Sequence, residues 1–193
     1  MLEGCLMNET QHTSLDVLYE RRTIHLYRED SVPQAWVDEA VNAAHHAPNH
    51  KHTWPWRFTH IGPETKGRIN GLALKMKSAN GPLEGAALET FNQKRVNPQL
   101  MVVSQVRSEN AMQSREDYAA VSCAIHNFTL ALAARGVGSK WSTGSMTRHP
   151  IAYELAGINA ETEEIVGFIW YGFAAKTPSP RRPEVAEIYR QVP

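Results

Sequence analysis

The sequence has few cysteines, no long apolar run and no excess of charge of either sign. Two cysteines in 193 residues are too few for a disulfide framework, so we expect a reduced, cytoplasmic protein. No run of about 18 apolar residues occurs, which predicts no membrane-spanning helix, and the N-terminus lacks the apolar core of a secretory signal. Lys and Arg number 20, as do Asp and Glu, so no overall field favours a nucleic acid or an anionic membrane as partner.

Familiar catalytic motifs are also missing. The chain contains no Gly-x-Ser-x-Gly nucleophile turn, no Walker lysine loop and no His-Glu-x-x-His zinc motif. Cys123 lies in a long apolar segment and is expected in the core rather than as a nucleophile. A chain without an obvious nucleophile or acid pair is expected to take its reactivity from a cofactor.

Periodicity and Gly/Pro breaks predict a mostly helical chain with a few separated strands, an α+β or α/β arrangement around one small sheet. Ser31 is the expected N-cap of the second helix, and the helix at 117–135, apolar nearly all round, is expected to be buried. We expect a flexible extension at 1–13 and a single domain at 14–193 that ends in an extended, proline-rich arm. The predicted helices are 14–22, 32–47, 63–77, 83–94, 117–135 and 150–156, and the predicted strands are 56–61, 100–106, 137–141 and 164–174.

Three segments combine groups that bind anions with groups that hold a flat ring. The first contains Arg21, Arg22, Thr23 and His25. Adjacent guanidinium groups repel each other, and a phosphate between them would relieve the repulsion. The alternative is a solvated arginine pair that complements the dipole at a helix C-terminus.

The second segment is a Pro-bounded turn, residues 47–56, that leads into a strand. Its tryptophans could stack on a ring while His50 and Lys51 donate hydrogen bonds to oxygen atoms. A polar loop with buried tryptophans is an equal alternative. The histidines at 45–52 also allow a metal-binding regulatory domain, but no Cys or Asp supports them and no zinc spacing fits.

The third segment, residues 136–144, is rich in Gly and hydroxyl side chains. Such a turn can place backbone N–H groups against an oxyanion, although glycine also ends ordinary helices.

In this order, the segments resemble the FMN-dependent nitroreductase family over about residues 14–183. The marks are Arg-Arg-Thr at 21–23, Ala-Pro-Asn-His-Lys at 47–51, Pro-Trp at 55–56, the helix at 118–135, Trp-Ser-Thr-Gly at 141–144 and the strand around 165–172. The Asn-His-Lys sequence is similar to that of a small subgroup of NAD(P)H nitroreductases.

The resemblance implies a nitroreductase-like α+β sandwich, with a small mixed or antiparallel sheet surrounded by helices, in an intertwined homodimer that holds FMN at its interface. It implies that the arginine segment holds the FMN phosphate, that the second loop meets the flavin of the other subunit, and that residues 131–136 bind nicotinamide. Trp54 stands where the family usually has Gln, and His25 where it has Arg or Lys. The cofactor-binding residues that the resemblance implies are Arg21, Arg22, Thr23, His25, Pro48, Asn49, His50, Lys51, Trp54, Trp141, Ser142, Thr143, Gly144, Arg181 and Arg182.

The implied activity is that of an FMN-dependent NAD(P)H oxidoreductase. It would reduce nitro compounds, quinones or similar electron-poor substrates by ping-pong hydride transfer through flavin N5, with NADH or NADPH as donor. No metal ion and no acid–base side chain is assigned. A non-catalytic flavin-binding module and a flavin dehalogenase or ring reductase remain as alternatives.

Overall fold

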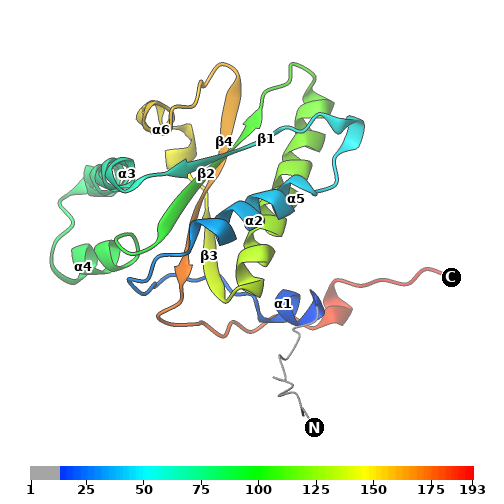
Figure 1. Ribbon diagram of the computed structural model, residues 1–193, viewed down its shortest axis with the longest axis horizontal. Coiled ribbons are helices and arrows are strands. Elements are labelled where there is room, and N and C mark those ends of the chain that lie inside the picture. The colour runs from blue at the N-terminus through cyan, green and yellow to red at the C-terminus, as the bar shows by residue number, and fades with distance from the viewer. Residues whose placement is uncertain (1–13) are drawn as a thin grey trace, which may run out of the picture.

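The computed structural model describes residues 14–193; the extension predicted at 1–13 lies outside them (Figure 1). Every predicted helix and strand is present in this part of the chain. None of its helices is long and apolar enough to cross a bilayer. The helices are α1 (Ser14–Glu20), α2 (Gln34–His45), α3 (Pro63–Lys77), α4 (Gly85–Gln93), α5 (Ala111–Ala134) and α6 (Pro150–Ala156). The strands are β1 (Trp56–Ile61), β2 (Gln99–Val106), β3 (Val137–Ser142) and β4 (Glu163–Phe173), and the short 3-10 turns are η1 (His50–His52), η2 (Ser78–Asn80), η3 (Ser145–Arg148) and η4 (Val185–Glu187).

The four strands form one sheet in the order β1-β2-β4-β3, and all neighbours are antiparallel. This confirms the α+β class and selects the antiparallel form of the expected sheet. One hydrophobic core lies between the sheet and helices α2 and α5, and a second lies between the opposite face and helices α3 and α6 (Figure 1). The central strands are apolar along most of their length because both of their faces are covered.

Three predicted helix starts differ from the observed ones, and that of α4 differs by only two residues, since it begins at Gly85 and not at 83. Pro33 is the N-cap residue of α2, with no side-chain cap, so the prediction for Ser31 was wrong. The fixed φ of proline, here −57°, sets the chain direction immediately before the helix, and Ser31 lies too far back to cap it. Helix α5 begins at Ala111 instead of 117, because the Asn110 side chain accepts a hydrogen bond from the Gln113 amide and supports a polar first turn.

Helix α5 is not buried all round. Its outward face carries Tyr118, which is 49% exposed, and also Ala119, Cys123 and His126. The prediction that Cys123 lies in the core was therefore wrong. Between Asp117 and Arg135 the sequence has no charged side chain, so periodicity alone could not separate the buried face from the exposed one.

An extended segment after α1 runs along the outer edge of β3. The Ile24 amide donates to the Ser139 carbonyl at 3.0 Å, and Thr23 forms a parallel bridge with Ser139. Gly138 permits this approach, since a Cβ atom there would lie 2.4 Å from Cγ1 of Ile24. The sheet edge thus holds the arginine segment in a defined orientation.

Candidate functional site

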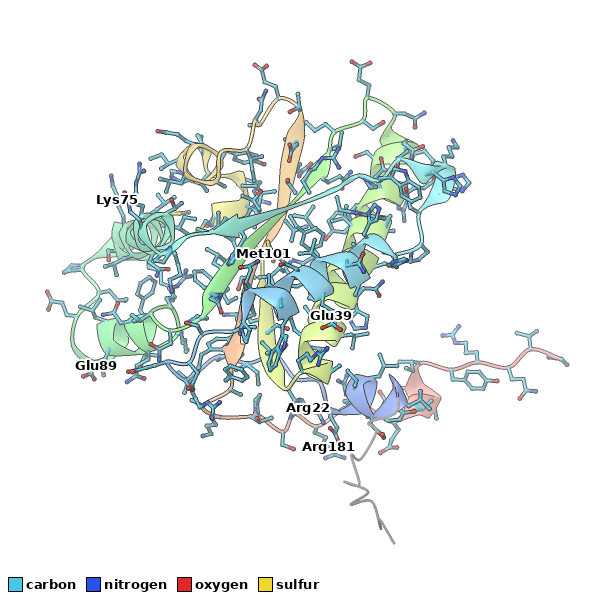
Figure 2. All side chains as sticks on the ribbon, viewed as in Figure 1. Arg22, Glu39, Lys75, Glu89, Met101 and Arg181 are labelled. Atoms are coloured by element: carbon cyan, nitrogen blue, oxygen red, sulfur yellow. The ribbon has the colours of Figure 1, made fainter. Side chains whose placement is uncertain are left out.

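The arginine segment leaves α1 at the end of the molecule that also receives the C-terminal arm. Burial, and then the positive charges of Arg182 and Arg22, lower the pKa of Arg21. Arg22 donates from Nη1 to the backbone carbonyls of Arg21, at 3.0 Å, and of Tyr19. Figure 2 shows Arg22 and Arg181 at this same end. The structure therefore brings the predicted early and late arginines together, in a partly desolvated group that favours an anion.

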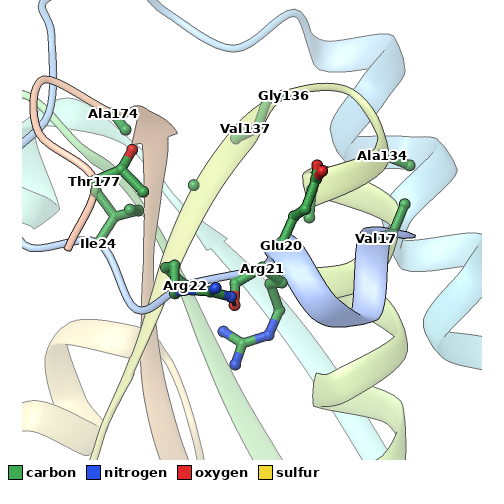
Figure 3. A pocket seen from close by; sticks show the side chains of 12 residues that line it. Val17, Glu20, Arg21, Arg22, Ile24, Ala134, Gly136, Val137, Ala174 and Thr177 are labelled. Carbon is green, nitrogen blue, oxygen red and sulfur yellow. Dashed lines mark hydrogen bonds between the residues drawn. The ribbon is translucent and has the colours of Figure 1, made fainter. Parts of the chain in front are cut away.

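A hollow of about 250 Å³ opens beside these arginines (Figure 3). Arg21, Arg22 and Ile24 line it from one side. The end of α5 and the start of β3 line it from the other, including Ala134 and Gly136. Part of the segment 131–136, to which the resemblance gives a nicotinamide role, thus lies against the arginine segment.

The second predicted segment is a turn held by a chain of hydrogen bonds. The Asn49 side-chain oxygen accepts from the Trp54 amide at 2.7 Å, and Asn49 Nδ2 donates to Thr53 Oγ1 at 3.1 Å. Thr53 Oγ1 donates in turn to Oδ1 of Asp117, a buried residue of α5, at 2.6 Å. These contacts hold backbone conformations that non-glycine residues rarely adopt, at the residues with positive φ: Lys51, His52 and Trp54.

This turn presents an aromatic surface. The rings of His52 and Trp54 stack with centroids 5.1 Å apart and an interplanar angle of 7°, and Trp54 is 45% exposed. Pro48, His50 and Lys51 are exposed around it. Within residues 14–193, no group of three His, Cys, Asp or Glu side chains is arranged to hold a metal ion.

The turn and the arginines lie near opposite ends of α5 (Figure 1). Thr53 is bonded to Asp117 in the first part of the helix, whereas Ala133 borders the hollow beside Arg21. At about 1.5 Å per residue, Asp117 and Ala133 are about 24 Å apart along the helix axis. One chain therefore does not bring the two predicted groups to a common point.

The third predicted segment forms the end of β3 and the turn that follows. The Trp141 indole donates to the Val166 carbonyl at 3.4 Å and lies against Gly167, where a Cβ atom would be 2.1 Å from Nε1. Ser142 ends the strand, and Thr143 leads into Gly144, whose φ of 109° requires glycine. Trp141, Thr143 and Gly144 are all exposed at this end of β3.

The sequence interpretation missed a second cationic group, next to His25. Burial, followed by the charges of Lys140 and Lys94, lowers the pKa of His25. Arg95 contributes further positive charge to the surroundings of Lys140. The members come from three distant parts of the chain, and the only signal in the sequence was the adjacent pair Lys94 and Arg95.

Comparison with known proteins assigns this architecture to a family. The model of the Nitroreductase family matches residues 18–173, most of the chain. The chain belongs to the Nitroreductase family. A curated relative, "Putative NAD(P)H nitroreductase YfhC" of Bacillus subtilis, is 29% identical over 177 residues, which cover 89% of this chain and 90% of that protein.

Solved structures agree with this family assignment. The Nitroreductase-like family protein from Bacillus cereus has a TM-score of 0.78 and 25% identity, covering 93% of this chain and 96% of its own. A variant of the FMN- and NADPH-dependent nitroreductase NfnB from Sphigopyxis sp. strain HMH has a TM-score of 0.76 and covers 93% of this chain and 98% of its own. At 14% identity, the latter supports the fold alone.

Proposed function

We propose that this chain is an FMN-dependent oxidoreductase that takes electrons from NADH or NADPH and passes them, in a ping-pong cycle, to nitro compounds, quinones or similar electron-poor acceptors. The observation that carries the proposal is the group of Arg21, Arg22 and Arg182 beside a hollow, in a Nitroreductase family member. The names of its relatives, an NAD(P)H nitroreductase and an FMN- and NADPH-dependent enzyme, agree with it.

The arginine group fits the phosphate of FMN. A phosphate carries a charge of about −1.5 to −2, which would offset the repulsion among partly desolvated guanidinium groups. Arg21 is the best placed donor, because Arg22 already donates to backbone carbonyls of its own segment. Thr23, held against β3 by its bridge to Ser139, adds a hydroxyl group two residues further along.

The direction of the same extended segment suggests where the flavin ring would lie. From Arg21 to His25 an extended chain spans about 13 Å, which separates a phosphate-binding end from a ring-binding end. At the ring-binding end we place the indole of Trp141 and the turn at Thr143 and Gly144. When bound, FMN supplies the hydride chemistry; the residues of the chain bind and orient it.

A second copy of the chain would complete the site. The turn at 48–54 lies about 24 Å along α5 from the arginine hollow, so in one chain it cannot reach the same cofactor. The outward face of α5 between Asp117 and Arg135 has no charged side chain and exposes Tyr118, as expected of a face that a partner covers. We therefore propose a homodimer in which each chain lends its Trp54 turn to the other chain's FMN.

An absorption spectrum tests the proposal most directly. The purified protein, or the protein reconstituted with FMN, is expected to be yellow, to bleach under NADH or NADPH without oxygen, and to recolour when a nitroarene is added. A protein that gains no flavin on reconstitution contradicts the proposal. A coloured protein that NADH and NADPH both fail to bleach would instead be a flavin-binding module without turnover.

A further inference from the structure

A second pocket lies on the other side of the sheet edge, between α3, α4 and the strands β3 and β4. Its volume is about 440 Å³. Its walls contain the aromatic rings of Phe91 and Trp170 and the apolar side chain of Leu83. The lining also contains the cationic side chains of Lys77, Lys94, Arg95 and Lys140.

The charge of this pocket is of one sign. Four of its lining residues are cationic, and none is an Asp or Glu. Burial, followed by the positive charges of Arg95, Lys94 and Lys77, lowers the pKa of Lys140. Cations gathered on a partly desolvated wall without a carboxylate are costly unless an anion joins them.

Arg95 brings an unsatisfied hydrogen-bond donor to this pocket. Its guanidinium carbon lies 4.9 Å from the ring centroid of Phe91 and 5.0 Å from that of Trp170. Its Nη1 atom is buried, with no hydrogen-bond partner among the described residues. A buried donor left unpaired costs free energy, and a carboxylate could accept a hydrogen bond from it.

We propose that this pocket binds an aromatic carboxylate, with the carboxylate among Lys94, Arg95 and Lys140 and the ring against the aromatic walls. The charges select the anion, and the apolar surface of Phe91, Trp170 and Leu83 selects a flat ring over inorganic phosphate.

The position of the pocket gives this ligand a role that rests on the proposed function. Lys140 and Trp141 are neighbours in β3. Lys140 pairs with Trp170 of one hydrophobic core, and Trp141 pairs with Ile169 of the other. The two side chains therefore leave the strand on opposite faces of the sheet. Lys140 also lies close enough to His25, at the proposed ring end of the FMN segment, to lower its pKa. The pocket and the proposed flavin wall therefore lie on opposite faces of the same end of β3, and the pocket meets the flavin-binding segment at His25. On that link the proposal extends to the acceptor class, electron-poor aromatic acids.

The test compares para-nitrobenzoate with its neutral analogue para-nitrobenzamide. Calorimetry on the FMN-free protein is expected to show at least tenfold tighter binding of the acid, the effect of one charge-assisted contact. Lys140→Gln is expected to remove most of that preference, whereas Lys75→Gln, an exposed residue in the last turn of the same α3 that carries Lys77, leaves it unchanged. The proposed pocket is refuted if the acid and the amide bind equally well, or if Lys140→Gln and Lys75→Gln reduce the preference for the acid by the same factor.

The flavin-loaded protein separates this inference from the proposed function. If FMN displaces para-nitrobenzoate, the pocket is part of the cofactor site and the inference is wrong. If the loaded protein reduces the amide as efficiently as the acid, the function stands and the acceptor class is wrong. Selective binding of the acid to a protein that never takes up flavin would keep the anion pocket and refute the redox role.

Discussion

The contact between Trp141 and Gly167 allows a sharp test of how the sheet edge is built. Gly167 lies in the central strand β4, and the Trp141 indole of the edge strand β3 covers it. A Cβ atom at residue 167 would be 2.1 Å from Nε1 and 2.5 Å from Cδ1 of that indole. Gly167→Ala must therefore displace a large, rigid side chain at the proposed flavin wall.

The magnitude follows from two opposing effects. Overpacking of this kind costs about 1–3 kcal/mol. Replacing glycine by alanine in a regular element returns about 0.5–1 kcal/mol through the unfolded state. We expect a net loss of about 1–2 kcal/mol in the free energy of unfolding. Gly67→Ala in α3, where a Cβ would meet no atom within 4 Å, is the matched control and should stabilise the protein slightly.

A double-mutant cycle assigns the cause. In a Trp141→Ala background, the nearest remaining atom to the new Cβ is the Ser142 carbonyl oxygen at 3.2 Å, which is tight but tolerable. Gly167→Ala should then be nearly neutral, which gives a coupling energy of about 1–2 kcal/mol. Urea unfolding followed by circular dichroism measures all four proteins. An equal cost of Gly167→Ala in both backgrounds would show that the indole contact is not its cause.

Three further predictions concern the arginine segment, the turn and the histidine beside Lys140. Arg21→Ala should weaken FMN binding by about 1.5–3 kcal/mol in a fluorescence titration, and unchanged affinity would remove Arg21 from the phosphate site. Asp117→Asn should lower the free energy of unfolding by about 1–2 kcal/mol and also weaken FMN binding, because the hydrogen bond from Thr53 loses its carboxylate acceptor. A loss of stability with unchanged FMN affinity would show that the turn at 48–54 takes no part in FMN binding. Because the pKa of His25 is lowered on folding, the unfolded chain binds more protons, so stability should be full above the ordinary histidine value of about 6.5 and fall as the pH drops below it. His25→Gln should flatten that fall in unfolding experiments across pH, and an unchanged slope would contradict the assignment.

The sequence predicted the elements well because most carry local signals. Strand β2 is a Val-rich run, and α6 lies between Pro150 and Gly157, so local composition was enough. The polar start of α5 was missed, because its first turn depends on the Asn110 cap and not on apolar periodicity. The exposure of Cys123 was missed because alanines and apolar residues occur on every face of this helix, so the sequence does not mark the face that is exposed.

The candidate site could be proposed from the sequence where its members adjoin in the chain. The arginine segment and the turn at 48–54 each occupy a few consecutive residues, and the structure shows a defined local geometry for each. The bond from Thr53 to Asp117, and the approach of Lys140 to Lys94 and Arg95, join residues far apart in the chain. Such contacts come from strand order and helix packing, which no local pattern encodes.

The zero net charge of the chain conceals a strong separation of charge. Cationic side chains gather at Arg21, Arg22 and Arg182 and again around Lys140. The hollow at the far ends of β2 and β4 has a net acidic lining, because Glu109, Glu161 and Glu164 outnumber Arg107. The balanced composition gives no net attraction for polyanions, because the opposite charges cancel beyond a Debye length of about 8–10 Å. Within that length they do not cancel, and a small anion that enters either cationic site encounters an attraction that the whole molecule lacks. Zero net charge is therefore compatible with the two anion sites that we propose, one for a phosphorylated cofactor and one for an acidic acceptor.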